Sequence, residues 1–241
     1  MPSNSKDNGD PSMQNKTPQP VNRKPKTKVL LVDDHPVLRR GLGQLINQEP
    51  DMAVCGEAED APHAFDAVAQ LTPDVVVVDV SLKGSNGIEL IKNLKARYPD
   101  LPILVLSMHD ESLYAERALR AGGLGYIMKD EAFEQVLTAI RQVLKGEIFL
   151  SDKMKGRMLQ QVAFGRTKAV SSPIETLTDR ELEVFRLIGQ GHGTRQIAEE
   201  LHLSVRTVEA YREYIKEKLN LKNATELVQH AFHWVHHQEA A

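Results

Sequence analysis

Residues 75–80 read Val-Val-Val-Val-Asp-Val, an apolar run interrupted by a single carboxylate. Because apolar side chains point to both faces, the run is typical of a central parallel strand that helices cover on both sides. In sheets of this kind, ligands bind beyond the carboxyl ends of the strands, which is where this carboxylate stands. The stretch therefore predicts both a fold class and the place of a site.

The surrounding sequence repeats a strand followed by a helix five times. Apolar runs that predict strands alternate with amphipathic runs that predict helices. The expected strands are 28–32, 52–57, 74–80, 102–107 and 125–128, and the expected helices are 36–48, 60–71, 87–97, 111–121 and 131–145. Five such units predict a five-stranded, doubly wound parallel α/β sheet.

Length and composition favour a two-domain globular protein. The 241 residues fit two modest domains better than one, since a domain usually has roughly 100–200 residues. Hydrophobic residues are 41% and charged residues 26% of the chain, which excludes wholesale disorder. The net charge of −3 excludes a histone-like polycation but leaves room for a local basic surface.

Cysteine usage and hydropathy narrow the class further. The single cysteine, Cys55, excludes a disulfide framework and an all-cysteine zinc site. No run approaches the roughly 18 apolar residues of a membrane span, and residues 1–10 lack the apolar core of a secretion signal. We expect a cytoplasmic protein.

Composition also suggests the domain boundaries. Residues 1–27 are rich in Pro, Asn, Ser and Lys without apolar periodicity, and we expect a disordered tail there. The α/β domain is expected over 28–147, a linker over 148–175 and a small all-α domain over 176–241. Ser151 is a candidate cap for a helix at about 152–163. This linker is either a passive connector or a helix that helps to hold the two domains together.

Polar side chains stand at the ends of four expected strands. Asp33 and Asp34 follow the first strand, Asp79 lies at the end of the third, Ser107 ends the fourth, and Lys129 follows the fifth. A lone aspartate at a strand end is more often a turn-former or helix cap. The coincidence of all five groups at one edge of the sheet favours a site.

This set of groups suits phosphoryl transfer. Three clustered carboxylates without a cation would raise one another's pKa. A hard cation removes that conflict, and oxygen ligands favour Mg²⁺. One carboxylate can then attack a phosphoryl group as a nucleophile. An ammonium and a hydroxyl are suited to stabilise the phosphoryl oxygens.

Residues 28–145 resemble the receiver domain of bacterial two-component signalling. The motifs that carry the resemblance are Val-Asp-Asp-His-Pro (32–36), Val-Val-Asp-Val (77–80), Gly-Ser-Asn-Gly (84–87), Leu-Ser (106–107) and Gly-Tyr-Ile-Met-Lys-Asp (125–130). The resemblance implies that Asp79 accepts phosphate from a kinase phosphohistidine. It implies Mg²⁺ ligands at Asp33, Asp34, Asp79 and the backbone carbonyl of Ser81, phosphoryl contacts from Ser107 and Lys129, and an aromatic switch at Tyr126.

Some positions depart from the receiver pattern or leave alternatives open. Leu82 and Lys83 stand where the family usually has methionine and proline. Without the resemblance, Tyr126 would be read as a half-buried packing residue with a solvated hydroxyl. Ser81 and His109 occupy positions at which receivers tune the lifetime of the phosphate.

The second half predicts four short helices. Thr178 and Glu181 form a capping box at the start of the first, and Gly189-Gln190-Gly191 ends it. Thr194 is expected to cap the second helix and Ser204 the third. The expected core positions of the third and fourth helices are Val205, Val208, Tyr211, Ile215, Leu219, Leu227, Val228, Ala231 and Trp234. Helix, tight turn and helix predict a helix-turn-helix arrangement.

The outer face of the third helix mixes side chains that read bases with side chains that hold phosphates. The expected DNA contacts are Arg195, Ser204, Arg206, Thr207, Glu209, Ala210, Arg212, Glu213, Lys216 and Lys218. Residues 195–222 carry six basic and five acidic side chains. On charge alone, an ordinary solvated face would therefore be the better interpretation.

This half resembles a LuxR-type DNA-binding domain. The motifs are Leu-Thr-Asp-Arg-Glu-Leu-Glu-Val (177–184), Gln-Ile-Ala-Glu-Glu-Leu (196–201), Leu-Ser-Val-Arg-Thr-Val-Glu-Ala-Tyr-Arg (203–212) and Lys-Leu-Asn-Leu (218–221). A receiver followed by this domain is typical of NarL/FixJ-type response regulators. The resemblance implies that the last helix forms a homodimer contact on DNA. His230, His233 and His237 are expected to be surface histidines, with a Zn²⁺ site as the alternative.

The combined hypothesis is a transcription regulator, phosphorylated by a sensor histidine kinase, that binds double-stranded DNA as a homodimer. It would catalyse only its own phosphoryl transfer and dephosphorylation, so we do not expect an enzyme. Two rivals remain: a phosphatase-like enzyme, and an interaction protein that uses the receiver fold without phosphate. Turnover of an external phosphoester would identify the first rival, and DNA binding that is independent of Asp79 would identify the second.

Overall fold

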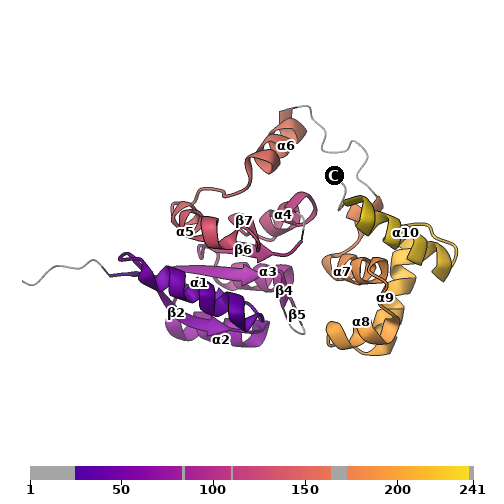
Figure 1. Cartoon of the computed structure of the whole chain (residues 1–241), viewed down its shortest axis with the longest axis horizontal. Coiled ribbons are helices and arrows are strands. Elements are labelled where there is room, and N and C mark those ends of the chain that lie inside the picture. Colours follow the sequence, from indigo (N-terminus) through magenta and orange to yellow (C-terminus); the bar gives the residue numbers. More distant parts are fainter. Residues whose placement is uncertain (1–24, 83–84, 110, 164–172, 239–241) are drawn as a thin grey trace, which may run out of the picture.

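The computed structural model describes residues 25–82, 85–109, 111–163 and 173–238 (Figure 1). Nearly all of the expected tail and most of the link after residue 163 lie outside these ranges, as does Lys83. Thr27, which we expected in the tail, is the first residue of a strand and pairs with Met52. None of the helices in the described part of the chain has the length and apolar character of a membrane span.

The first domain is the predicted five-stranded parallel sheet. Its strands are β1 (Thr27–Val32), β2 (Met52–Ala58), β3 (Val75–Asp79), β6 (Ile103–Ser107) and β7 (Gly125–Met128), in the order β2-β1-β3-β6-β7. All neighbouring pairs in this sheet are parallel. The doubly wound fold predicted from residues 75–80 is therefore confirmed, with β3 at the centre.

Helices cover both faces of this sheet (Figure 1). They are α1 (Pro36–Gln48), α2 (Ala61–Leu71), α3 (Gly87–Arg97), α4 (Glu111–Arg120) and α5 (Ala132–Val143). Along β3, Val75 and Val77 pack in the cluster with α1 and α5, while Val76 and Val78 pack in the cluster with α2, α3 and α4. Alternation of side chains along a strand explains why four consecutive valines are all buried.

A short hairpin follows β3 and was not predicted. β4 (Ser81–Leu82) pairs antiparallel with β5 (Ser85–Asn86), so that Ser81 lies opposite Asn86. Two-residue strands are too short to show an alternating pattern, which is why the sequence did not reveal them. The hairpin places Asn86 as the N-cap of α3, where its Oδ1 atom accepts a hydrogen bond from the Ile88 amide at 2.8 Å.

The linker contains the helix expected there. α6 (Asp152–Ala163) begins after Ser151, whose Oγ accepts from the Met154 amide at 3.1 Å. The segment before it is tied to the sheet, because Phe149 bridges to Gly125 and its carbonyl accepts from the Tyr126 amide at 2.9 Å. The start of the linker is thus fixed to the first domain.

The second domain is the predicted small helical bundle, formed by η1 (Pro173–Thr176), α7 (Asp179–Gly189), α8 (Thr194–Glu200), α9 (Val205–Lys218) and α10 (Ala224–Gln238). The Thr178–Glu181 capping box is present. The cap of α8 was placed wrongly. Gly193 is the N-cap, and its amide donates to the Gln196 side chain at 2.8 Å, so Thr194 is the first helical residue.

Two expected core residues of this bundle lie at the surface. Val205 is 40% and Val228 is 43% exposed. Val205 is the first residue of α9, before the helix reaches the bundle. On α10, Leu227, Ala231 and Val235 form the buried stripe, at a spacing of four residues, and Val228 lies beside that stripe. Periodicity predicted both helices correctly but misjudged the edge of each buried face.

Candidate phosphoacceptor site and nucleic-acid interface

The register of the sheet brings the predicted site residues together. Val32 pairs with Val78, so Asp33 and Asp79 are neighbours at the ends of β1 and β3. One side-chain ligand atom each from Asp33, Asp34, His35 and Asp79 lies within 4.8 Å of the others. The three carboxylates predicted to converge are therefore close enough to share one ion.

Lys129 reaches into this cluster from the end of β7. Its Nζ lies 2.8 Å from Asp33 Oδ2 and 2.7 Å from Asp79 Oδ2. Burial raises the pKa of Asp79 to about 7, against the lowering effect of the Lys129 charge, and the Asp33 carboxylate raises it further. A positive charge beside Asp79 therefore favours the ionised carboxylate that a nucleophile needs.

The donor set fits a divalent cation. Asp33 Oδ2 and Asp34 Oδ1 are buried and make no hydrogen bond of acceptable geometry, although Lys129 Nζ lies 2.8 Å from the first and His35 Nδ1 lies 2.8 Å from the second. Buried carboxylate oxygens are normally satisfied by a donor or an ion. Hard cations such as Mg²⁺ take oxygen ligands of this kind. The Ser81 amide donates to Asp79 Oδ1 at 3.1 Å, and the role of the Ser81 carbonyl as a ligand stays a prediction.

The predicted switch residues meet on the loop after β6. Ser107 is fully buried, and its Oγ accepts from the His109 amide at 2.9 Å. The Tyr126 hydroxyl donates to the His109 carbonyl at 2.7 Å. Tyr126 is thus buried with a hydroxyl bonded to protein, unlike the half-buried packing residue of the alternative interpretation. Its movement on phosphorylation stays a prediction.

We call the cluster of Asp33, Asp34 and Asp79 the acid site. His109 connects this site to α4. Its Nε2 lies 2.8 Å from Ser81 Oγ, and its ring stacks on Tyr114 with 4.5 Å between centroids. Burial lowers the pKa of His109 to about 3, so the imidazole is neutral at neutral pH. Ser81 and His109, the two residues that we predict to tune the lifetime of the phosphate, therefore contact each other directly.

Gly87 allows α3 to begin against the backbone of β3. A Cβ atom at this position would lie 2.1 Å from the Asp79 carbonyl oxygen and 2.7 Å from Val80 Cα. We expect Gly87→Ala to destabilise the protein by about 1–3 kcal/mol, because these backbone atoms have to shift. Urea unfolding followed by circular dichroism measures the loss.

Gly156→Ala is the matched control for this prediction. Gly156 lies in α6, and a Cβ atom there meets nothing within 4 Å. Alanine favours a helix over glycine by up to about 1 kcal/mol, so this variant should be as stable as the parent or slightly more stable. Equal stability of the two variants would contradict the close-packing argument.

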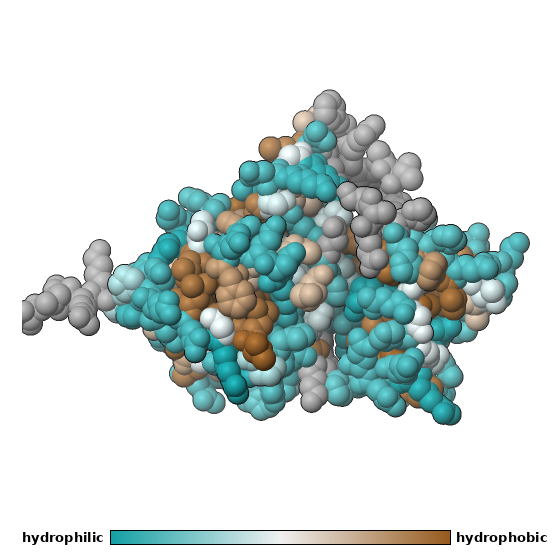
Figure 2. Space-filling model, viewed as in Figure 1, coloured by the Kyte–Doolittle hydropathy of each residue, from teal (hydrophilic) through white to brown (hydrophobic). Residues whose placement is uncertain are grey.

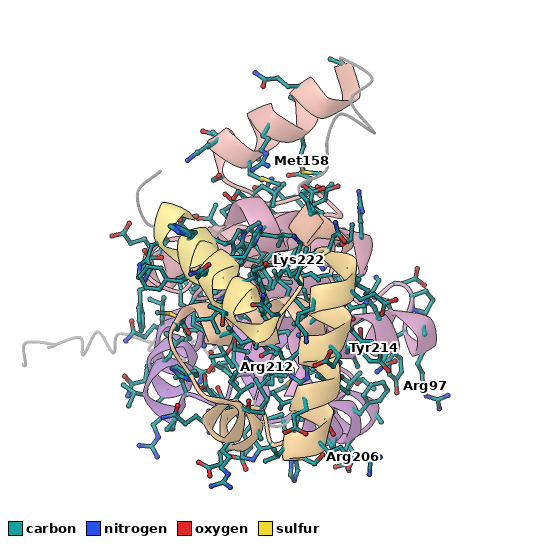
Figure 3. The ribbon with its side chains drawn as sticks, turned by 90° about the vertical axis from the view of Figure 1, so that its right-hand side faces the viewer. Arg97, Met158, Arg206, Arg212, Tyr214 and Lys222 are labelled. Atoms are coloured by element: carbon teal, nitrogen blue, oxygen red, sulfur yellow. The ribbon has the colours of Figure 1, made fainter. Side chains whose placement is uncertain are left out.

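The predicted DNA-reading helix, α9, is accessible. Figure 3 shows it on the outer surface of the helical domain, with Arg206 near its start and Arg212 and Tyr214 further along. Ser204 caps it, accepting from the Thr207 amide at 3.0 Å. Arg206, Glu209 and Glu213 are exposed, Thr207, Ala210, Arg212 and Lys216 are partly exposed, and Arg195 is exposed on α8.

Two residues of α9 differ from the sequence interpretation. Lys218 Nζ lies 2.6 Å from Glu181 Oε2, so it joins α9 to α7 in addition to the phosphate contact we predict. Tyr214 is 53% exposed and was missed. Tyr214 lies four residues after Ala210 and eight after Arg206, so all three are on one helix face. This spacing could have identified Tyr214 from the sequence.

The two domains meet through α7. Figure 1 shows α7 on the side of the bundle next to the receiver sheet, with α9 beyond it. Asp179 Oδ1 lies 2.9 Å from Arg117 Nη1 of α4, and Asp179 Oδ2 lies 3.0 Å from Lys92 Nζ of α3. Asn86, in the hairpin next to the acid site, donates to Glu183 at 3.4 Å. We call the three ion-paired residues Lys92, Arg117 and Asp179 the interdomain latch.

Comparison with known proteins agrees with both halves of the structure. Residues 29–141 match the response regulator receiver domain, and residues 175–231 match the luxR family of bacterial regulatory proteins. The oxygen regulatory protein NreC of Staphylococcus carnosus is 37% identical over 208 residues, which cover 85% of this chain and 96% of NreC. The chain is a NarL/FixJ-type response regulator. NreC of Staphylococcus aureus is similar to it at 38% identity, with the same coverage.

Solved response regulators share its architecture. RcsB from Salmonella enterica serovar Typhimurium, bound to the promoter P1flhDC in the presence of BeF₃⁻, aligns with a TM-score of 0.58 and 27% identity over 86% of this chain and 98% of RcsB. A LuxR-family regulator from Aurantimonas aligns with a TM-score of 0.52 and 34% identity over 60% of this chain and all of that protein. The shared architecture is thus one that binds promoter DNA in RcsB.

The histidines of α10 in this response regulator lie near aromatic rings. The His230 ring is 6.0 Å from Phe185, and His233 and His236 contact Phe232. Among the side chains that the structure describes, the only group that could hold a metal is Asp33, Asp34, His35 and Asp79. The side chain of His237 lies outside the described set, so the zinc alternative stays untested.

Proposed function

We propose that this response regulator accepts a phosphoryl group on Asp79 from a sensor histidine kinase in a Mg²⁺-dependent reaction. The phosphoryl group then controls DNA binding by α9 and the transcription of target genes. The observation that carries the proposal is the convergence of Asp33, Asp34, Asp79 and Lys129 at the ends of β1, β3 and β7 in a chain with a LuxR-type domain.

The chemistry assigns one role to each group. An Asp79 carboxylate oxygen forms the new bond to phosphorus while the bond to the kinase histidine nitrogen breaks, and that nitrogen keeps the electron pair. Lys129, already 2.7 Å from Asp79, is placed to neutralise the phosphoryl oxygens, and Ser107 to donate a hydrogen bond. Asp33, Asp34 and Asp79 would hold Mg²⁺, which would add positive charge against the same oxygens.

We propose that the kinase docks on the face of α1. Figure 2 shows an apolar patch over α1 and α5. Val37 of α1, two residues after His35, is 82% exposed, and Phe133 of α5 is also exposed. Large exposed apolar patches usually mark interaction sites. The patch adjoins the site that the phosphohistidine has to reach.

The interdomain latch offers a route from phosphate to DNA. Ser107 and Tyr126 both bond to the backbone of His109, and His109 stacks on Tyr114 of α4, the helix that carries Arg117. We propose that phosphorylation shifts this loop and α4, and so changes the hold on Asp179. A 100-fold change in population would need about 2.7 kcal/mol of differential stabilisation, an amount that one ion-paired phosphate can supply.

On DNA, we propose a homodimer whose two α9 helices read a two-fold site. Val228 and Phe232 are exposed on α10, where a second copy can cover them. The test is to phosphorylate the full chain with acetyl phosphate and Mg²⁺, select DNA from a random pool, and titrate the selected duplex. A two-fold sequence that binds more tightly after phosphorylation supports the proposal. Identical binding with and without acetyl phosphate refutes it.

Arg206 should carry a large part of the DNA affinity. It is exposed at the first turn of α9, where recognition helices contact bases and phosphates. Arg206→Ala is expected to weaken binding of the selected duplex by about 1–3 kcal/mol, or roughly 5- to 150-fold. Fluorescence anisotropy at fixed salt measures this. Arg97→Ala, which removes an exposed arginine from α3 of the receiver, is the control and should bind as the parent does (Figure 3).

A further inference from the structure

His35 follows the acid pair and faces the acid site. Its backbone amide donates to Asp33 Oδ1 at 2.7 Å, which folds the loop back over the carboxylates. As a result, His35 Nδ1 lies 2.8 Å from Asp34 Oδ1, 3.1 Å from Asp33 Oδ1 and 3.8 Å from Asp79 Oδ2. His35 is the N-cap residue of α1, yet its side chain makes no capping hydrogen bond. The imidazole is therefore directed at the site and not used to begin the helix.

A positive centre already lies between these groups. Lys129 Nζ is 2.7 Å from Asp79 Oδ2, 2.8 Å from Asp33 Oδ2 and 3.2 Å from His35 Nδ1. An ammonium has donors only, so a hydrogen bond to Nδ1 requires the Nδ1 lone pair. A protonated Nδ1 could donate only one hydrogen, whereas this atom faces three carboxylates and an ammonium. The surroundings of His35 Nδ1 therefore resemble those of a ligand atom that shares a cation with carboxylates.

We propose that His35 Nδ1 is a direct ligand of the divalent cation at this site and shifts its selectivity from Mg²⁺ toward Mn²⁺. The inference rests on the proposed function only in placing a cation among Asp33, Asp34 and Asp79. Mg²⁺ prefers oxygen ligands and retained water, whereas first-row transition ions gain more from an imidazole nitrogen. A site of three carboxylates and one imidazole therefore favours the transition ion more than the carboxylates alone would.

Direct ion binding to the unphosphorylated full chain tests the proposal. Mn²⁺ is the suitable probe because it is the weakest binder in the Irving–Williams order, so the α10 histidines compete least for it. Free Mn²⁺ is measured by electron paramagnetic resonance, and Mg²⁺ affinity by displacement of Mn²⁺. His35→Ala is expected to weaken Mn²⁺ binding on the order of tenfold and Mg²⁺ binding by less than about threefold. Pulsed measurements should show nitrogen coupling to bound Mn²⁺ in the parent and none in the variant.

His63→Ala is the matched control. His63 Nδ1 also lies near an aspartate, 2.7 Å from Asp60 Oδ1, but it pairs with this single carboxylate and is not part of the cluster of Asp33, Asp34, His35 and Asp79. This variant should bind both ions as the parent does. His35→Asn is a second variant, because asparagine is a favourable N-cap and preserves the start of α1. It should lose the nitrogen coupling of an imidazole while the circular dichroism spectrum is unchanged.

The outcomes separate this inference from the proposed function. Equal weakening of both ions, no weakening of either, or imidazole coupling that persists in His35→Ala would overturn the role of His35. Phosphoryl uptake on Asp79 is compatible with any of these three results. If the parent binds neither ion, both the ligand role and the cation site of the proposed function are refuted, whereas uptake on Asp79 measures the phosphoacceptor independently.

Discussion

Asp79→Asn is expected to lower phosphoryl uptake from acetyl phosphate by on the order of 100-fold or more, because an amide oxygen lacks the charge of the attacking carboxylate. Intact-protein mass spectrometry after incubation with acetyl phosphate and Mg²⁺ measures the fraction that carries one phosphoryl group. Asp79 is almost fully buried between Asp33 and Lys129. Among the described carboxylates, Asp33 is the other one that pairs with Lys129.

Reduced stability of Asp79→Asn should not explain its loss of phosphoryl uptake. The folded-state pKa of Asp79 is about 7, above its ordinary value of 3.8, and burial is the main cause. The folded state therefore binds a proton that the unfolded state releases, so the ionised side chain costs stability progressively as pH rises from about 4 through 7. An amide removes this cost. The variant should unfold at the same or a higher urea concentration than the parent at a pH of about 7.5.

Asp130→Asn is the matched control for the phosphoacceptor. Asp130 directly follows Lys129 but is exposed. It should take up phosphoryl groups as the parent does. If Asp79→Asn retains normal uptake, Asp79 is not the acceptor and the proposed function fails at its first step.

Asp179→Ala is expected to open the interdomain latch. The side chain of Asp179 is 10% exposed and pairs with two cations, of which Lys92 is 47% exposed. Removing one partner of a buried pair costs about 3–5 kcal/mol, and the exposed lysine lowers our expectation to about 2 kcal/mol, or roughly 30-fold. Hydrogen–deuterium exchange at the contact between α4 and α7 should increase accordingly. The ratio of DNA affinities with and without phosphate should fall toward one, because coupling requires a contact between the sites.

Glu175→Ala is the control that separates the loss of the interdomain latch from a simple change in net charge. Glu175 lies in η1 beside the latch, is exposed, and supplies only its backbone carbonyl to Arg117. Its removal changes net charge as Asp179→Ala does but should preserve the phosphate effect on DNA affinity. An unchanged ratio in Asp179→Ala would show that another contact carries the coupling.

Much of the acid site was predictable because strand ends are local features. The valine run at 75–78 indicated a central parallel strand, and parallel strands bring their carboxyl ends to one edge. Asp33, Asp79, Ser107 and Lys129 each end or follow a strand, so pairing of the strands was enough to bring them together. Helix α9 was predictable for a similar reason, since its cap and its apolar period are read within a few residues.

The sequence by itself determined the five-stranded parallel sheet, the helical bundle and the edge at which the carboxylates meet. These features follow from the periodicity of apolar residues and from helix caps, both of which are set within one or two turns of a helix or within one strand. Only the tertiary structure decided that His35 turns toward the acids, that Lys218 pairs with Glu181, and that Asp179 reaches Arg117 and Lys92. The last contact joins residues 62 and 87 positions apart in different domains. Such ion pairs depend on how folded surfaces dock, and charged side chains at the surface carry no local pattern that names their partners.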